Sequence, residues 1–309
     1  MPGHSFEAVL AGLRAAAEPT RLRLLAMCAE GEITVGEITR VIGQSQPRVS
    51  RHLKLLCDAG LLERFREEHS MYYRMPGIGD GAVLAREILS LIAVADPIRE
   101  QDHARANQMR AARAAAAAEH LPDAAASTQS RALTAELTSI LLAAVAGERI
   151  GRLLDVGSGF GRVLRVLASQ ADEAVGLDIS IEALRFARST LHAAGLSSCT
   201  LRRGDMYQLP FAAGSFDMVT IDAVLHGARD PVAVLRQAAL ALRANGRIVL
   251  LDDIERLARR LGHSMVDGVL GDWLQRAGFS LQSVARVDAR GESILVIVAR
   301  RAAPVEAAA

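Results

Sequence analysis

Leu153-Leu-Asp-Val-Gly-Ser-Gly-Phe-Gly161 is a short apolar run that passes directly into a loop with a glycine at every second position. An apolar run of this length, bounded by a turn signal, is typical of a buried β-strand. Glycine has no Cβ, so the loop backbone can approach a bound molecule closely, and a helix that follows presents free N–H groups to an anion. The stretch therefore predicts a strand, a ligand-binding loop and a helix, in that order.

Around this stretch, strand-like and helical patterns alternate through the second half of the chain. This alternation indicates an α/β sandwich with a mostly parallel sheet. The last two strand-like runs follow Ala277-Gly-Phe279 and predict a hairpin at the edge of the sheet. The seven predicted strands are 152–156, 174–177, 200–203, 218–221, 247–251, 281–287 and 294–298.

Two acidic residues support the interpretation of the glycine loop as a ligand site. Asp178 ends the second predicted strand, 17 residues after Gly161, where a carboxylate can bind both hydroxyls of a ribose. Asp205 ends the third predicted strand. A nicotinamide-dependent dehydrogenase shares the loop and the first acid, but its loop has the spacing G-x-G-x-x-G. The spacing here is D-x-G-x-G-x-G, beginning at Asp155, which argues against a dehydrogenase.

In these features residues 137–301 resemble the class I methyltransferases that use S-adenosylmethionine, whose fold is a Rossmann-like seven-stranded sheet. The runs 216–226 and 242–249 are similar to later motifs of that family. The resemblance implies that S-adenosyl-L-methionine or S-adenosyl-L-homocysteine binds here, with the loop at the methionine portion, Asp178 at the ribose, and Asp205 with the Met206 backbone at the adenine. The implied cofactor-binding residues are Asp155, Gly157, Gly159, Gly161, Asp178, Asp205 and Met206.

Catalysis is a separate question, because the cofactor motifs do not select a methyl acceptor. Methyl transfer needs a positioned nucleophile, often assisted by a base. His226, after the fourth predicted strand, is the first candidate base and Asp222 is the second, while a structural role for His226 is the alternative. Cys199 stands alone, so an arsenite methyltransferase is not expected. The segment 119–128 has no Phe, Tyr or Trp, unlike the aromatic-rich segment of fused relatives, and this favours sensing over catalysis.

The amino-terminal third has the spacing of a helix-turn-helix. Apolar residues recur at helical intervals in 6–13, 22–27 and 33–42, and a further helix follows Gln44-Ser-Gln-Pro47 and runs to Asp58. In this last helix Val49, Leu53 and Leu56 share one face, which is the stripe needed to hold it against a core.

The opposite face of the same helix is polar and basic. The stretch from Arg40 to Lys54 contains four cations and no acid. Arginine pairs with guanine and glutamine with adenine in the major groove, while other cations and hydroxyls bind phosphates. His52 borders the apolar stripe, so it could either donate to a phosphate or pack in the core. The predicted DNA-binding residues are Gln46, Arg48, Ser50, Arg51, His52, Lys54 and Arg66.

Two strand-like runs, 61–66 and 71–75, flank Glu67-Glu-His-Ser70 and predict a hairpin. A hairpin after a recognition helix is a wing, although a helical bundle with a solvated face is an alternative. Residues 18–76 resemble the ArsR family of winged-helix repressors, including Asp58-Ala-Gly-Leu-Leu62 and Tyr72-Tyr-Arg74. The resemblance implies a homodimer that binds a palindromic DNA operator and releases it in response to a ligand.

Many members of the ArsR family sense metals, but the residues here predict no metal site. The family signature E-L-C-V-C-D-L falls on Glu32-Ile-Thr-Val-Gly-Glu-Ile38, where Thr34 and Gly36 replace both thiolates. Some relatives bind metal on a helix after the wing. Asp102, His103 and His120 lie in that region, but their spacing does not place them on one helical face.

The middle of the chain predicts a dimer helix and a linker. Leu84, Ile88, Leu91 and Ile92 share one face of an amphipathic run, and an alanine-rich polar helix over 98–119 would extend about 33 Å if continuous. The predicted mixed fold therefore has an α+β winged helix-turn-helix domain for DNA binding and dimerisation over 1–95, a helical linker over 96–130, and an α/β methyltransferase-like domain over 131–305.

The composition agrees with this organisation. A chain of 309 residues can bury two cores, and a net charge of +1 requires DNA contacts to come from a local cluster. The three cysteines lie far apart and form no C-x-x-C pair, which fits a reducing cytoplasm. No signal peptide or membrane span is expected.

The first hypothesis is an ArsR-type transcriptional repressor whose methyltransferase-like domain binds an S-adenosyl compound as effector or cofactor. The second is an active small-molecule methyltransferase with an autoregulatory DNA-binding domain. In the third, both modules are interaction surfaces with inactive sites.

Overall fold

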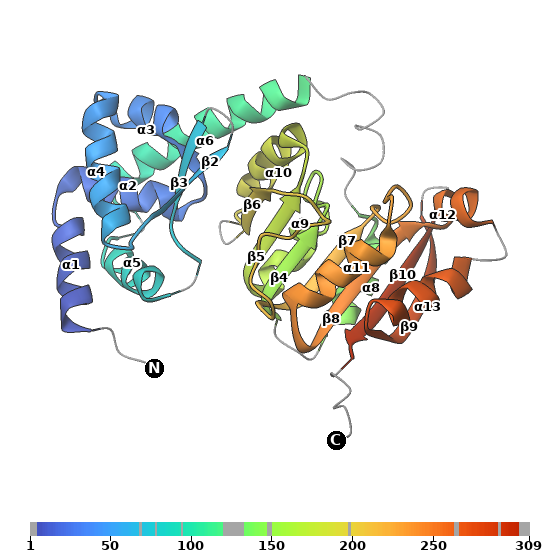
Figure 1. Ribbon diagram of the computed structural model, residues 1–309. Helices are drawn as coiled ribbons and strands as arrows, with labels where there is room; N and C mark the ends of the chain where they lie inside the picture. Colours follow the sequence, from blue (N-terminus) through green and yellow to red (C-terminus); the bar gives the residue numbers. More distant parts are fainter. Residues whose placement is uncertain are drawn as a thin grey trace. The chain divides into compact units, whose positions relative to one another are not determined.

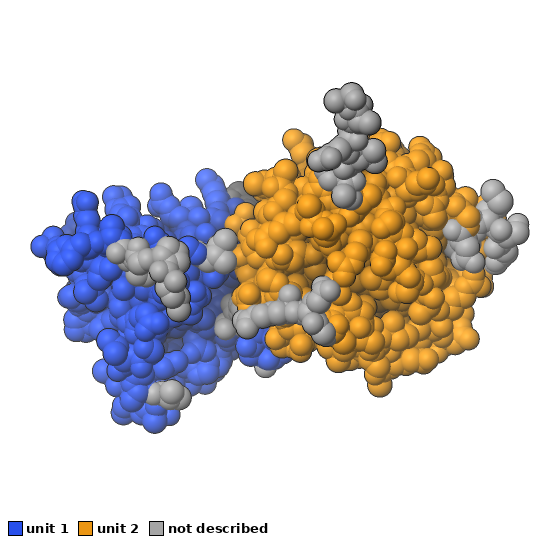
Figure 2. Space-filling view, turned by 90° about the horizontal axis from the view of Figure 1, so that it is seen from below, with its two compact units in different colours: residues 1–119, 188–200 blue, residues 120–187, 201–309 orange. Residues whose placement is uncertain are grey.

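The computed structural model describes residues 5–67, 70–77, 79–93, 95–119, 133–146, 150–196, 199–262, 266–289 and 292–302 (Figure 1). The chain divides into two compact units, residues 1–119 with 188–200 and residues 120–187 with 201–309 (Figure 2). Within the described ranges, no helix combines the length and the apolar character needed to cross a membrane.

The first unit begins with four short helices whose ends follow local capping rules. They are α1 (Phe6–Ala16), α2 (Pro19–Ala29), α3 (Val35–Ile42) and α4 (Gln46–Asp58). The Glu18 carboxylate caps α2 by accepting the Arg21 N–H at 2.9 Å, and α3 ends at Gly43 with a φ of 71°. The predicted helix-turn-helix is confirmed as α3 and α4.

The sequence prediction is wrong at the start of α3. Ile33 and Thr34, expected to be helical, form the short strand β1 (Ile33–Thr34), in which Ile33 pairs with Tyr73. The reason is that Thr34 caps α3: its hydroxyl accepts the Glu37 N–H at 3.2 Å, and Glu37 accepts the Thr34 N–H at 2.8 Å. A capping residue needs extended backbone, so it leaves the helix.

The predicted wing is confirmed as β2 (Glu63–Glu67) and β3 (Ser70–Arg74), and the three-stranded sheet has the order β1-β3-β2. Two helices follow, α5 (Asp80–Ser90) and α6 (Pro97–Glu119). His120 and the rest of the predicted linker, to residue 130, lie outside the described residues.

The core of the first unit contains the apolar face of α4, as predicted, because Val49, Leu53 and Leu56 are fully buried. The stripe expected on the dimer helix is divided. Ile88 packs into this core, whereas α5 ends at Ser90 and leaves Leu91 exposed beyond it. Buried apolar residues of α5 therefore belong to the core of the first unit.

All seven predicted strands are present in one sheet of order β6-β5-β4-β7-β8-β10-β9, which belongs to the second unit except for Cys199 and Thr200 at the start of β6. Strand β10 runs antiparallel between β8 and β9, which confirms the hairpin at the edge. The strands are β4 (Ile150–Val156), β5 (Ala171–Asp178), β6 (Cys199–Arg203), β7 (Phe216–Asp222), β8 (Leu242–Asp253), β9 (Phe279–Ala289) and β10 (Glu292–Arg301).

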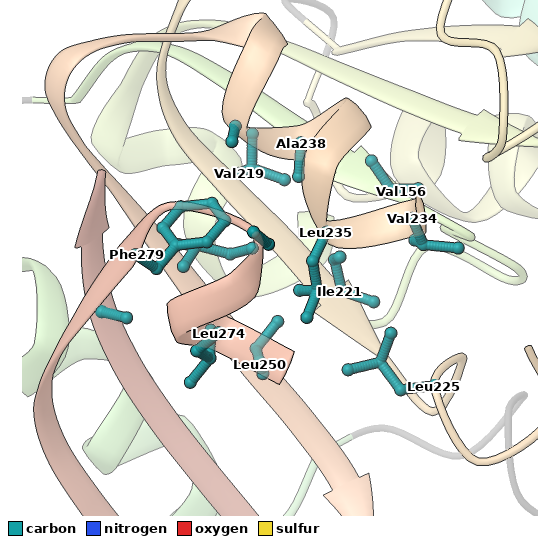
Figure 3. Packing of buried hydrophobic residues seen from close by; sticks show 14 of the residues in the cluster. Val156, Val219, Ile221, Leu225, Val234, Leu235, Ala238, Leu250, Leu274 and Phe279 are labelled. Carbon is teal, nitrogen blue, oxygen red and sulfur yellow. The ribbon is translucent and has the colours of Figure 1, made fainter. Parts of the chain in front are cut away.

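Helices cover this sheet and enclose its main core. Figure 3 shows Leu235 and Ala238 of one helix and Leu274 of another packed over Val219, Ile221 and Leu250 of the central strands. The core holds the strands in register, so their carboxyl ends present the loops that carry the site residues. The helices are α8 (Ala135–Val145), α9 (Leu164–Leu167), the single turn η1 (Ala168–Gln170), α10 (Ile181–Ala193), α11 (Pro231–Ala241), α12 (Ile254–Leu261) and α13 (Val266–Arg276).

Candidate functional site

The glycine loop lies between β4 and α9 and has a backbone that side chains would disturb. Gly157, Gly159 and Gly161 have φ values of 70°, 49° and 73°, in the left-handed region that favours glycine. A Cβ at Gly157 would lie 2.4 Å from Val224 Cγ2. The Gly157 N–H donates to the Leu177 carbonyl at 2.8 Å, so the loop is fixed against the end of β5.

Asp178 at the end of β5 joins the loop to the next helix. Its Oδ2 accepts the Gly159 N–H at 2.7 Å, and its Oδ1 accepts the Ser180 N–H at 2.8 Å. The side chain is half-buried, and each carboxylate oxygen has a further lone pair. A carboxylate oriented in this way can accept two hydroxyl groups from a ribose.

Asp155, one of the predicted cofactor-binding residues, is buried beneath the loop. Its side chain is 1% exposed and accepts the Thr220 hydroxyl at 2.6 Å. Burial raises the pKa of this carboxyl to about 8, because a charged group loses its hydration in the interior. With almost no exposed surface, Asp155 supports the loop from below and Asp178 meets the ligand side.

The third predicted contact lies at the end of β6. The Gly204 N–H donates to the Asp178 carbonyl at 2.9 Å, which brings the loop of Asp205 beside Asp178. The Asp205 side chain is exposed and caps a turn by accepting the Tyr207 N–H at 2.9 Å. Met206 is half-buried and packs on the core. The glycine loop, Asp178 and Asp205 therefore lie at the carboxyl ends of β4, β5 and β6, and this donor set fits an S-adenosyl compound.

The two candidate bases have different partners. Arg162 binds both carboxylate oxygens of Asp222, with Nη2 at 2.6 Å from Oδ1. Since both oxygens are engaged and the side chain is only 8% exposed, Asp222 is unsuited to accept a substrate proton. This corrects its place as the second candidate base. Arg162 is not among the predicted site residues, although it directly follows the last glycine of the loop.

His226 has the geometry of an oriented base. Its Nδ1 lies 2.6 Å from Asp252 Oδ1, and its backbone N–H donates to Asp252 Oδ2 at 3.0 Å. Asp252 is buried near the end of β8, and the imidazole is partly exposed. A carboxylate on Nδ1 holds the ring and leaves Nε2 to exchange a proton. Asp252 is not among the predicted site residues, and the acidic pair Asp252-Asp253 at a strand end is the sequence signal that could have indicated it.

A second candidate surface lies on α4 in the first unit. Gln46, Arg48, Arg51 and Lys54 are exposed, and Ser50 is half-buried. Lys54 Nζ pairs with Asp58 Oδ2 at 3.0 Å.

Two other predicted DNA contacts differ in position. Arg66 is exposed on the wing strand β2. His52 has a side chain only 13% exposed, and its Nδ1 lies 3.6 Å from Glu18 Oε2 beside α2. The imidazole therefore packs against the unit, which is one of the two positions that the sequence leaves open for His52.

The residues that replace the family's metal thiolates have structural roles. Thr34 and Glu37 form the capping box of α3, and Gly36 is exposed. Glu32 is buried and accepts a hydrogen bond from Arg74 Nη1 at 2.9 Å. The Glu32–Arg74 pair joins the wing strand β3 to the segment between α2 and β1.

Two family models match the chain, one in each unit. Residues 18–64 match the arsR family of bacterial regulatory proteins, and residues 154–250 match the methyltransferase domain. The first range contains the helix-turn-helix, and the second runs from β4 through β8.

Individual relatives match one part or the other. A probable mercury resistance operon repressor of Streptomyces lividans is 43% identical over 75 residues, 24% of this chain and 60% of that protein. The uncharacterized methyltransferase YcgJ of Bacillus subtilis is 30% identical over 101 residues, 33% of this chain and 40% of that protein. The crystal structure of YcgJ has a TM-score of 0.47 at 15% identity and covers 55% of this chain and 100% of that one. The chain thus spans between 40% and 60% of the length of these two curated relatives.

Proposed function

We propose that this chain, which joins an ArsR-family winged helix-turn-helix module to a class I methyltransferase domain, is a transcriptional repressor that senses an S-adenosyl compound. The supporting observation is that one chain carries both an exposed cationic face on α4 and a glycine loop bridged by Asp178. A DNA-binding regulator acts where the DNA is, so the proposal places the protein in the cytoplasm.

Each site residue has a defined task in this proposal. Gln46, Arg48 and Arg51 contact base edges and phosphates in the major groove. The open backbone of the glycine loop receives the methionine portion of the ligand, Asp178 binds the ribose, and Asp205 with the Met206 backbone binds the adenine. The bound compound supplies a sulfonium centre as S-adenosylmethionine and a neutral thioether as S-adenosylhomocysteine.

The proposal includes a homodimer. Apolar side chains on α1, on α5 and directly after α5 remain exposed in the first unit, and exposed apolar patches of this kind mark interaction surfaces. A second copy that covers them would place two α4 helices on the two halves of a palindrome. These side chains are Phe6, Leu10, Leu13, Val83 and Leu91.

Calorimetry tests the coupling directly. The protein is titrated with S-adenosylmethionine and with S-adenosylhomocysteine, with and without DNA of its own promoter. A typical coupling of about 1–3 kcal/mol changes the ligand affinity about 5- to 150-fold when DNA is present, and linkage requires the same change in DNA affinity. Equal ligand affinities with and without DNA would remove the sensing mechanism and leave the two modules uncoupled.

A second candidate function is small-molecule methyl transfer with autoregulation by the DNA-binding module. The observation that favours it is the His226–Asp252 pair, in which a buried carboxylate orients an accessible imidazole. The test is transfer of a labelled methyl group from S-adenosylmethionine to a panel of small acceptors with hydroxyl, amine or thiol groups. If S-adenosylmethionine binds but no methyl group is transferred to any of these acceptor classes, the sensor function is the one that remains.

A further inference from the structure

The first unit contains a cavity of about 440 Å³ that the proposed function does not use. It lies between α2, α6 and the segment that joins α5 to α6. Its volume falls within the range of about 300–1,000 Å³ that is usual for small-molecule sites. Met27 and Ala106 are buried at the cavity, and Ile98 is exposed beside it. The cavity is therefore open to solvent at one side and apolar at depth.

Small and apolar side chains make up much of the cavity wall. Leu22 and Ala26 of α2 lie on one side, Ile98 and Ala106 of α6 on another, and Ile92 on the joining segment. Ala26 and Ala106 end in a single methyl group, so the two helices leave space between them that longer side chains would fill. Cavities with apolar walls bind apolar molecules in preference to water.

The acidic side chains that line the cavity all have partners within the protein. Asp102 accepts two hydrogen bonds from Arg23, each at 2.7 Å. Glu30 lies 3.2 Å from His103 Nε2 and 3.5 Å from Arg99 Nη2. Asp96 accepts the Arg99 N–H at 3.0 Å, and Glu18 caps α2.

The remaining cation at the cavity, Arg110, is only 2% exposed and donates to the Met27 carbonyl at 3.2 Å. Each charged side chain that lines the cavity therefore has a partner within the protein. An ionic ligand would have to break one of these pairs and lose its own hydration, which costs free energy. A neutral ligand avoids both costs.

We propose that this cavity is a second ligand site, which binds one neutral and largely apolar small molecule per chain and is independent of the S-adenosyl site. Helix α6, which forms part of its wall, also contacts the helix-turn-helix, because Arg105 Nη1 donates to the Val41 carbonyl of α3 at 3.4 Å. A molecule held between α2 and α6 thus touches a helix that supports the DNA-binding module.

Two fluorescent dyes with the same aromatic rings but different charge test the site. Phenylnaphthylamine is neutral, and anilinonaphthalene sulfonate carries one negative charge. In titrations of the full-length protein we expect phenylnaphthylamine to saturate at one molecule per chain and to bind about tenfold or more tightly than the sulfonate, a difference of about 1.4 kcal/mol or more. Equal affinities for the two dyes would overturn the charge argument.

Matched variants locate the bound dye. Ala26→Phe fills the cavity from α2, and we expect it to weaken phenylnaphthylamine binding about tenfold or more. Ala104→Phe is the control, because Ala104 is exposed on α6 and does not line the cavity. Equal dye affinity in the two variants would overturn the site.

A second variant keeps the test valid if Ala26→Phe does not fold, which circular dichroism will show. Ile98→Asp places an unpaired charge at the open side of the cavity, where Ile98 is 55% exposed, so the fold should tolerate it. We expect this variant to weaken the neutral dye while S-adenosylhomocysteine binds as in the wild type. Loss of S-adenosylhomocysteine binding in this variant would contradict the independence of the two sites.

Discussion

Asp155 couples the stability of the second unit to pH. Its ordinary pKa is 3.8, and burial raises it to about 8 in the folded protein. The folded state therefore holds the proton more tightly than the unfolded state, and the stability from this group is complete below about pH 4 and is lost as the pH rises to about 8. The free energy of unfolding of Asp155→Asn, relative to the wild type, should rise across this window by at most about 1.4 kcal/mol per pH unit.

Urea denaturation at several pH values between 5 and 8 measures this difference. Asp172→Asn is the control, because Asp172 is an exposed acid on the same strand, β5. A difference between Asp155→Asn and wild type that does not change with pH would show that Asp155 is ionised in the folded protein.

His226 and Asp252 carry a prediction about catalysis. With any acceptor that the protein methylates, His226→Gln and Asp252→Asn should each lower turnover by about 100- to 10,000-fold, the usual contribution of a positioned base. The affinity for S-adenosylhomocysteine should stay unchanged, because these side chains do not belong to the cofactor loop. The comparison is made with His103→Gln, an exposed histidine of the first unit. Unchanged turnover in both variants would assign the pair a structural role.

At the scale of elements, α4 carries the prediction for DNA. Arg51 is exposed on the face opposite Val49, Leu53 and Leu56, so Arg51→Ala should weaken operator binding without loss of stability. If Arg51 pairs with guanine, discrimination at one base position should fall by about 1–3 kcal/mol. Arg14→Ala, which removes an exposed cation from α1, provides the comparison in a gel-shift assay with single-base operator variants. Equal losses of operator affinity in both variants would show that the loss comes from the lower positive charge of the protein and not from a specific contact of Arg51.

The sequence predicted elements well where a short-range pattern determines them. The seven strands, the helix-turn-helix and the wing each have an apolar period or a turn signal, and all are present. It failed at Ile33 and Thr34, where a cap and a pairing with β3 override helical spacing. The pairing of His226 with Asp252 and that of Asp222 with Arg162 could not be predicted, because the paired residues lie 26 and 60 residues apart in the chain.

At the scale of the whole molecule, the two units should lose their functions separately. Asp178→Ala removes the carboxylate that bridges Gly159 and Ser180, so calorimetry should detect no S-adenosylhomocysteine binding. The same variant should still bind promoter DNA, because the α4 surface has its own core in the first unit. Joint loss of both activities would mean that the DNA-binding module depends on the methyltransferase domain to fold.

Lys54, on the exposed face of α4, is the one lysine among the 309 residues. Its side chain is 69% exposed, so an amine-reactive dye labels the recognition helix and, apart from it, only an amino terminus. DNA that occupies α4 should shield this amine, which makes the rate of labelling a direct measure of operator occupancy. A cross-linker that joins two lysine side chains cannot act within one copy. Any such product must therefore connect the recognition helices of two copies.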